Sequence, residues 1–234
     1  MSKRRLSKQQ QRRISAVRTR SGNSPEAAAE VCNGRVVSHF GQQLDVEDLQ
    51  ADPPSVIRCH QRANLPPLVT GDLVVWEAGE DGSGVVTAQA QRRNVFVRPD
   101  YLGRDKPVAA NLDVVLVVFA VVPEPFPNLI DRYLVAIESL GLHAALVLNK
   151  ADLITTATSD IDGILSVYQH LGYPVFRVSA ETGDGIGALA DFLSGKTTVL
   201  VGQSGVGKSS LINRLAGDLG PDLTAEVGAL SVGK

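Results

Sequence analysis

The chain has 234 residues, of which 44% are hydrophobic, and this content suffices to bury a core and excludes a wholly disordered protein. The net charge is only -2, no apolar run reaches the roughly 18 residues of a membrane-spanning helix, and the polar N-terminus lacks the apolar centre of a secretory signal. Two cysteines and four scattered histidines supply neither a disulfide framework nor metal-ligand spacing, so we expect a reduced, cytoplasmic protein.

The first 20 residues form a strongly basic segment. They contain eight Lys or Arg and no acidic residue, whereas the rest of the chain carries 15 basic and 25 acidic side chains. A short basic arm on an acidic body is typical of a segment that follows a phosphate backbone, and counterion release makes such binding sensitive to salt. A solvated tail that only aids solubility is the alternative. We expect residues 1–29 to be a disordered basic arm and linker.

Residues 30–106 have the pattern of a small β-barrel. Their β-branched segments are separated by turn-rich clusters, and they lie at residues 34–40, 43–47, 55–62, 72–79 and 84–99. About five short strands in so short a region fit an antiparallel barrel of the oligonucleotide-binding (OB) type, which binds RNA through a basic face and a few aromatic side chains.

Basic residues near the last of these strands would supply the RNA-binding face, and they are Arg92, Arg93, Arg98 and Arg104. Aromatic residues are few. Trp76 follows two valines on a strand, so we expect it in the core rather than on a base-stacking surface.

From residue 107 to residue 234, apolar strands alternate with helical patterns. Strands are expected at 111–122, 144–148, 174–179 and 197–201, and helices at 128–141, 159–171, 185–193 and 208–217. Gly141 is a fitting helix C-cap. This alternation predicts an α/β domain with a parallel sheet covered by helices, and in such sheets ligands bind at the carboxyl ends of the strands.

The strongest motif is the phosphate-binding loop GQSGVGKSS, which follows a strand and opens a helix. Its backbone N–H groups, from Gly205 to Ser209, and the helix N-terminus would hold phosphates. Lys208 would reach the β- and γ-phosphates as the catalytic residue, and the Ser209 hydroxyl would bind Mg2+. The predicted nucleotide contacts in this loop are Gly202, Gln203, Ser204, Gly205, Val206, Gly207, Lys208, Ser209 and Ser210.

The sequence NKAD at residues 149–152 predicts which base is bound. A carboxylate at Asp152 can accept hydrogens from N1 and the 2-amino group of guanine, and adenine offers neither. Lys150 would cover the purine, and Asn149 would bond the base edge and brace the loop. Because the match is only four residues long, Asp152 fits a helix N-cap equally well. NKAD becomes a strong indication of guanine binding only together with the phosphate loop in the same sheet.

A second, weaker base-binding element is SAETG, which follows the next strand. The Ala180 amide would meet guanine O6. The complete set of predicted base contacts is Asn149, Lys150, Ala151, Asp152, Ser179 and Ala180.

The motifs occur in an unusual order, with NKAD first, SAETG second and the phosphate loop last. An ordinary small GTPase has the phosphate loop first, so this order indicates a circularly permuted nucleotide domain. Together with the stretches LVTGDLVVWE (68–77), PVAANLDVVLVV (107–118) and GQSGVGKSSLIN (202–213), the chain resembles the RsgA family, the bacterial ribosome-small-subunit-dependent GTPases.

This resemblance implies an OB barrel, a circularly permuted GTPase domain and a C-terminal zinc domain. It implies that GTP is hydrolysed to GDP and phosphate, with stimulation by the small (30S) ribosomal subunit during late maturation of that subunit. The implied partners are GTP or GDP, the small subunit and its rRNA, with no membrane, and the protein would be a monomer.

The sequence after the phosphate loop departs from the family. TAEVGALSVGK, residues 224–234, resembles the start of the first switch, but no D-x-x-G and no Cys/His cluster for zinc follow it. We therefore expect a truncated chain whose zinc ligands lie beyond residue 234. Two alternatives stay open: a GTP- or GDP-binding module without turnover, because the switch elements are missing, and a P-loop kinase or ATPase with an RNA-binding barrel, against which NKAD argues.

Overall fold

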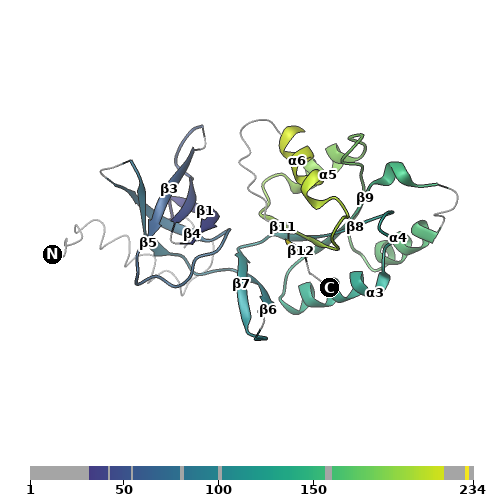
Figure 1. Cartoon of the computed structure of the whole chain (residues 1–234), viewed down its shortest axis with the longest axis horizontal. Coiled ribbons are helices and arrows are strands. Elements are labelled where there is room, and N and C mark those ends of the chain that lie inside the picture. Colours follow the sequence, from purple (N-terminus) through teal and green to yellow (C-terminus); the bar gives the residue numbers. More distant parts are fainter. Residues whose placement is uncertain are drawn as a thin grey trace. The chain divides into compact units, whose positions relative to one another are not determined.

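The computed structural model describes residues 32–41, 43–53, 55–79, 82–99, 102–155, 160–218 and 230–231. The predicted basic arm and most of the segment 224–234 lie outside these residues. The chain divides into two compact units between Asn111 and Leu112 (Figure 1).

The first unit contains a closed five-stranded barrel with strand order β1-β2-β3-β5-β4 (Figure 1). The strands are β1 (Gly34–Phe40), β2 (Gln43–Asp48), β3 (Ser55–Gln61), β4 (Leu73–Ala78) and β5 (Gly84–Gln89). Neighbouring strands are antiparallel except β3 and β5, which are parallel. This is the predicted OB-type barrel, with one parallel pair that the sequence pattern did not indicate.

Inward-facing side chains fill the barrel, and they are Val36, Leu44, Val46, Cys59, Leu68, Val74 and Val86. Trp76 packs against this core and its indole Nε1 donates a hydrogen bond to the Asn33 carbonyl over 3.2 Å. The Trp76 side chain therefore serves the core, as predicted, rather than a base-stacking surface.

The single strand predicted over residues 84–99 was wrong. The chain leaves the barrel after β5, and β6 (Val95–Pro99) pairs with β7 (Asp105–Ala110) in a separate antiparallel hairpin. Strand β7 was missed because its sequence, DKPVAA, contains a proline and two charged residues, which are rare in strands. Hydrophobic periodicity does not indicate that the strand is interrupted after β5, because the interruption is fixed by contacts with residues far away in the sequence.

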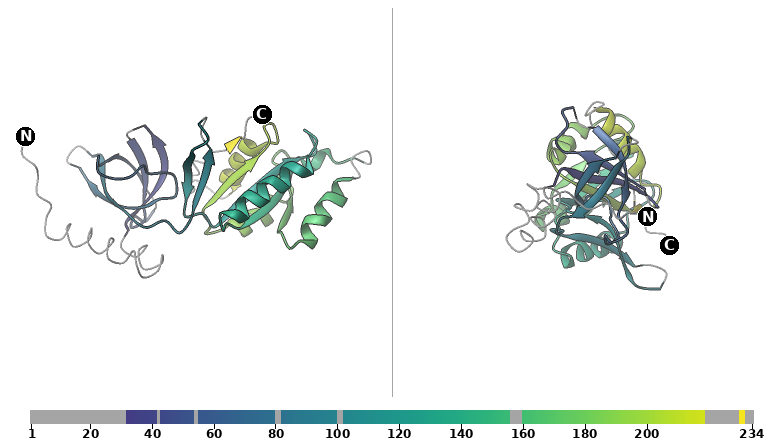
Figure 2. Two further views of the ribbon diagram at one scale, coloured as in Figure 1. Left: turned by 90° about the horizontal axis from the view of Figure 1, so that it is seen from below. Right: turned by 90° about the vertical axis from the view of Figure 1, so that its left-hand side faces the viewer.

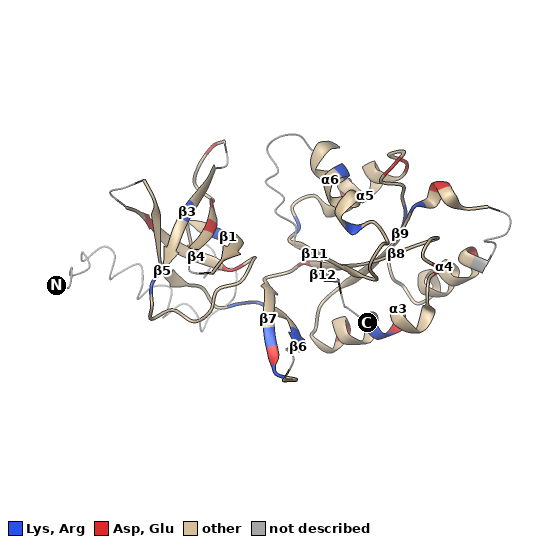
Figure 3. Ribbon diagram, viewed as in Figure 1, with Lys and Arg blue, Asp and Glu red and all other residues tan. Residues whose placement is uncertain are grey.

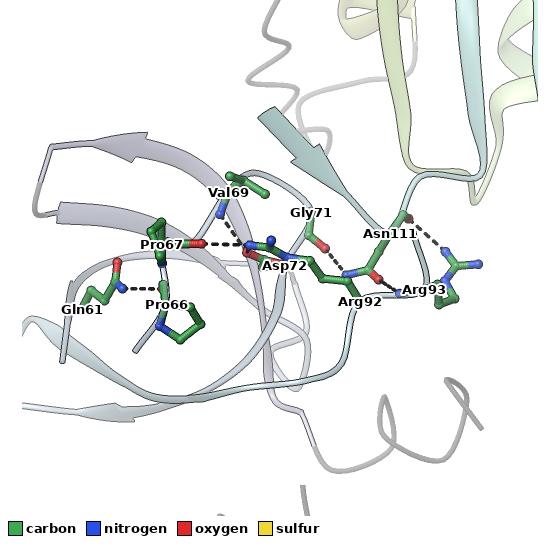
Figure 4. A network of polar contacts seen from close by, with 9 residues as sticks. All are labelled: Gln61, Pro66, Pro67, Val69, Gly71, Asp72, Arg92, Arg93 and Asn111. Carbon is green, nitrogen blue, oxygen red and sulfur yellow. Dashed lines mark hydrogen bonds and ion pairs between the residues drawn. The ribbon is translucent and has the colours of Figure 1, made fainter. Parts of the chain in front are cut away.

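Those contacts are made by a buried carboxylate (Figure 4). Asp72 is fully buried and accepts hydrogen bonds from Arg92 Nε at 2.7 Å and Arg92 Nη2 at 2.8 Å. The adjacent Arg93 donates its backbone N–H to Asn111 Oδ1 and its Nη2 to the Asn111 carbonyl. Two of the four arginines predicted to face RNA are thus engaged in contacts within this unit.

We expect Arg92→Ala to destabilise the first unit by about 3–5 kcal/mol, because removing one partner of a buried ion pair leaves an uncompensated charge. Denaturant titration followed by Trp76 fluorescence measures the free energy of unfolding. Arg98→Ala, at an exposed position of β6, is the matched control. An equal loss of unfolding free energy in both variants would show that the Asp72–Arg92 ion pair does not stabilise the barrel more than an exposed arginine does.

The second unit is a parallel sheet with strand order β10-β9-β8-β11-β12. Its strands are β8 (Val114–Ala120), β9 (Ala144–Asn149), β10 (Val175–Arg177), β11 (Thr198–Gly202) and β12 (Leu230–Ser231). The helices are α3 (Pro127–Ser139), η1 (Ala151–Leu153, a 3-10 turn), α4 (Asp160–His170), α5 (Ile186–Leu193) and α6 (Lys208–Asp218). Every predicted helix and strand of this unit is present, within a few residues of its predicted ends.

Helices cover both faces of the sheet, with α5 and α6 on one side and α3 and α4 on the other (Figures 1 and 2). Every residue of β8 and β9 is consequently buried, which explains their uninterrupted apolar sequences. The C-cap of α3 is Leu140, one residue before the predicted Gly141, which has φ 68° and directly follows it. Within the described ranges, no helix combines the length and apolar character required to cross a membrane.

Candidate nucleotide-binding site

The three predicted motifs follow β9, β10 and β11, and therefore lie at one edge of the sheet, where the strands have their carboxyl ends. The phosphate loop connects β11 to α6. At its start, Gly202 has φ 150°, and a Cβ there would lie 2.0 Å from the Val118 carbonyl oxygen of β8. Only glycine permits this close approach, which fixes where the loop leaves the sheet.

Lys208 lies inside the phosphate loop. Its side chain is buried, and Nζ donates hydrogen bonds of 2.9 Å to the carbonyl oxygens of Gly202 and Gln203. Burial lowers the pKa of the Lys208 ammonium from its ordinary value, because a charged group loses hydration there. Ser209 and Ser210 are exposed in the first turn of α6. The loop thus holds its lysine between backbone carbonyls while leaving the serine hydroxyls accessible.

Asn149 connects all three motifs. Its carboxamide is almost fully buried, and Nδ2 donates to the Val206 carbonyl of the phosphate loop over 2.9 Å. Its Oδ1 accepts a 3.1 Å hydrogen bond from the Ala180 amide of SAETG. The predicted bracing role of Asn149 is therefore visible, whereas the Ala180 amide, expected to meet guanine O6, is directed at Asn149 in this structure.

Lys150 forms a second connection to the phosphate loop. Its backbone is left-handed, with φ 57°, and Nζ donates hydrogen bonds of 2.8 Å to the carbonyls of Val122 and Gly205. Asp152 is exposed inside η1, whose N-cap is Lys150. Asp152 is therefore not the N-cap of this turn, and its carboxylate is available at the same edge of the sheet as the phosphate loop.

The SAETG loop is closed on itself. Ser179 is buried, its Oγ accepts the Thr182 amide at 3.1 Å, and its carbonyl accepts the Gly183 amide at 2.8 Å. The guanidinium of Arg214, on α6, lies against Gly183, because a Cβ at that glycine would be 2.3 Å from Arg214 Nη2. Arg214 belongs to none of the predicted motifs, and a lone arginine within a helix resembles an ordinary solvated residue.

Metal-binding capacity follows from the same residues. No group of three or more His, Cys, Asp or Glu side chains placed to hold a metal ion occurs among the residues that the structure describes. A magnesium ion in a phosphate loop needs no such cluster, because one hydroxyl, the nucleotide's own phosphate oxygens and water molecules fill most of its coordination sphere. The exposed Ser209 hydroxyl at the start of α6 fits that requirement.

The chain is similar in sequence to known GTPases. Residues 89–234 match the family model of the RsgA GTPase. The small ribosomal subunit biogenesis GTPase RsgA of Pseudomonas syringae pv. tomato is 54% identical over 200 residues, which cover 85% of this chain and 57% of that protein. The chain thus spans little more than half the length of this relative.

Two solved structures are also similar. YjeQ from Thermotoga maritima is 35% identical, with a TM-score of 0.66 over 78% of this chain and 64% of that chain. YloQ, described as a circularly permuted GTPase, is 33% identical, with a TM-score of 0.63 over 77% of this chain and 62% of that chain. The reversed motif order agrees with the description of YloQ as a circularly permuted GTPase, and the chain belongs to the RsgA GTPase family.

Proposed function

We propose that this protein binds GTP, hydrolyses it to GDP and phosphate, and acts in late maturation of the small ribosomal subunit, in contact with its rRNA. The observation that carries the nucleotide assignment is the position of Asn149, whose carboxamide bonds both the phosphate loop and SAETG. The predicted base-binding motifs and the phosphate loop are thereby connected in one site. A cytoplasmic, monomeric protein suits this role.

The chemistry assigned to the site is largely positioning. The backbone N–H groups of Gly205 to Ser209 and the N-terminus of α6 face the phosphates, and the Lys208 charge offsets the negative charge that develops during transfer. Mg2+, when bound through the Ser209 hydroxyl, neutralises the phosphate oxygens. Asp152, with Lys150 and Ala151 beside it, selects guanine.

Single-turnover GTP hydrolysis, with and without small ribosomal subunits, tests the proposal. Hydrolysis by this protein should be strongly stimulated by small subunits. Stimulation by large subunits alone, or none by either, would contradict the ribosomal assignment. For base selection, GDP and GTP should displace a fluorescent guanine nucleotide from this chain at least about 100-fold better than ATP does.

A second candidate is a GTP- or GDP-binding module without turnover. It concerns residues 1–234 by themselves, in which no D-x-x-G follows the phosphate loop. That element normally provides the carboxylate behind Mg2+ and the contact to the γ-phosphate. Residues 1–234 should then bind GDP tightly but show negligible stimulated hydrolysis, and robust stimulation would exclude this candidate.

A further inference from the structure

The outer face of β1, β2 and β3 carries one exposed aromatic ring. Residues paired across these strands point to the same side of the sheet. The register therefore forms two outward rows, of which the first is Ser38, Asp45 and Arg58 and the second is Phe40, Gln43 and His60. Phe40 is 51% exposed at the end of β1, diagonally across from Arg58.

Arg58 is held in place before any ligand arrives. Asp45, only 9% exposed, accepts hydrogen bonds from Arg58 Nε and, at 3.2 Å, from Arg58 Nη2, while Ser38 Oγ donates to the same carboxylate at 3.1 Å. The Arg58 guanidinium carbon then lies 5.0 Å from the centre of the Phe40 ring. Because the ion pair fixes the guanidinium, little conformational entropy is lost when a third planar group joins the stack.

The local charges are balanced. Arg58 is paired with Asp45, and Arg35 on the same strands lies 3.6 Å from Glu47. Figure 3 shows acidic and basic residues interspersed over the barrel strands rather than separated. These strands therefore offer little electrostatic attraction to a phosphate backbone. Their distinctive feature as a binding surface is the pair of planar groups, the Phe40 ring and the Arg58 guanidinium.

We propose that Phe40 and Arg58 form a stacking platform for an unpaired base of single-stranded RNA. This deepens the proposed function and rests on its rRNA contact. Strands 2 and 3 are where barrels of this type bind oligonucleotides, and stacking on an aromatic ring tolerates any base. A protein partner would require an apolar, well-packed centre, whereas the neighbours of Phe40 in the two rows are polar.

Fluorescence anisotropy with an oligoadenylate of about 12 nucleotides, and with an abasic strand of equal length and charge, tests the platform. Wild-type protein should bind the oligoadenylate more tightly, and Phe40→Leu should reduce that preference by about 10- to 100-fold. Affinity for the abasic strand should not change. Phe40→Trp should retain the preference, because it keeps the planar face.

Salt dependence separates the platform from the basic arm. Phe40→Leu should leave the slope of affinity against salt concentration unchanged, because it removes no phosphate contact, whereas deletion of residues 1–20 should flatten it. Phe126→Leu, 57% exposed in the second unit, is the matched control and should have no effect.

Three results would overturn the platform. The first is an undiminished base preference in Phe40→Leu. The second is an equal loss in Phe126→Leu. The third is weaker binding of Phe40→Leu to small subunits with an unchanged preference for the oligoadenylate, which would indicate a protein contact. If wild-type protein binds neither RNA nor small subunits, the proposed rRNA contact itself is wrong. If Phe40→Leu binds small subunits normally and keeps the base preference, only the platform is wrong.

Discussion

Asp152→Asn is expected to lower the affinity for GDP by at least about 100-fold and to favour xanthosine diphosphate instead. The carboxylate accepts two hydrogens from guanine, whereas an asparagine amide donates one and accepts one. Xanthine carries an oxygen in place of the guanine 2-amino group, so the new Nδ2 donor finds an acceptor and Oδ1 still accepts from N1. The structure leaves Asp152 exposed and outside the N-cap of η1, so its replacement should disturb the fold little.

Competition of GDP, xanthosine diphosphate and ADP against a fluorescent guanine nucleotide measures this switch. Asp191→Asn, an exposed carboxylate on α5, makes the same chemical change away from the predicted base contacts. It should leave all three affinities unchanged. An Asp152→Asn variant that keeps the wild-type preference for GDP would remove Asp152 from base recognition and would reopen the choice of nucleotide.

The reversed motif order has no effect on where the motifs lie in space. Strands β9, β8 and β11 are neighbours and run parallel, so the loops that follow β9 and β11 meet at one edge of the sheet whichever comes first in the chain. For this reason the meeting of the motifs at one edge of the sheet was predictable from motifs and alternation alone. The apolar runs of β8 and β9 indicated buried central strands equally well, because both faces of these strands are covered.

Features that depend on distant partners were not predictable. The break after β5 is tied to Arg92, which pairs with Asp72 twenty residues earlier, and sequence periodicity carries no record of that ion pair. Arg93 bonds Asn111 for the same reason, although both arginines resemble RNA-binding residues in the sequence. The Phe40 and Arg58 stack likewise requires the register of three strands.

Within the site, the contact that the motif did not indicate is the one between Asn149 and Ala180. The motif assigns the Asn149 side chain to the base edge and to bracing the loop, and the structure shows its donor on Val206 of the phosphate loop and its acceptor on Ala180 of SAETG. A four-residue motif specifies which side chain is present and not which of several polar groups it reaches. The loops on both sides of Asn149 come from other strands, so only their assembly reveals the connection.

Asn149→Ala should therefore weaken the fold as well as nucleotide binding. The substitution leaves the buried Val206 carbonyl and the half-buried Ala180 amide without their partner, and a buried unsatisfied group costs about 1–3 kcal/mol. We expect the nucleotide-free protein to lose about 1–4 kcal/mol of stability, because water can partly satisfy the Ala180 amide. Affinity for GDP should fall as well, because neither loop is then held in position. Denaturant titration without nucleotide and binding of a fluorescent guanine nucleotide measure the two effects.

Asn149→Asp sharpens this test. The aspartate keeps an acceptor for the Ala180 amide but turns an oxygen toward the Val206 carbonyl, so it should weaken the phosphate loop at least as much as alanine does. Asn128→Ala, exposed in the first turn of α3, is the control and should change neither quantity. If Asn149→Ala lowers GDP affinity but leaves the nucleotide-free stability intact, Asn149 acts on the base alone. The physical link between the base and phosphate elements would then have to be carried by Lys150, whose Nζ is bonded to Gly205.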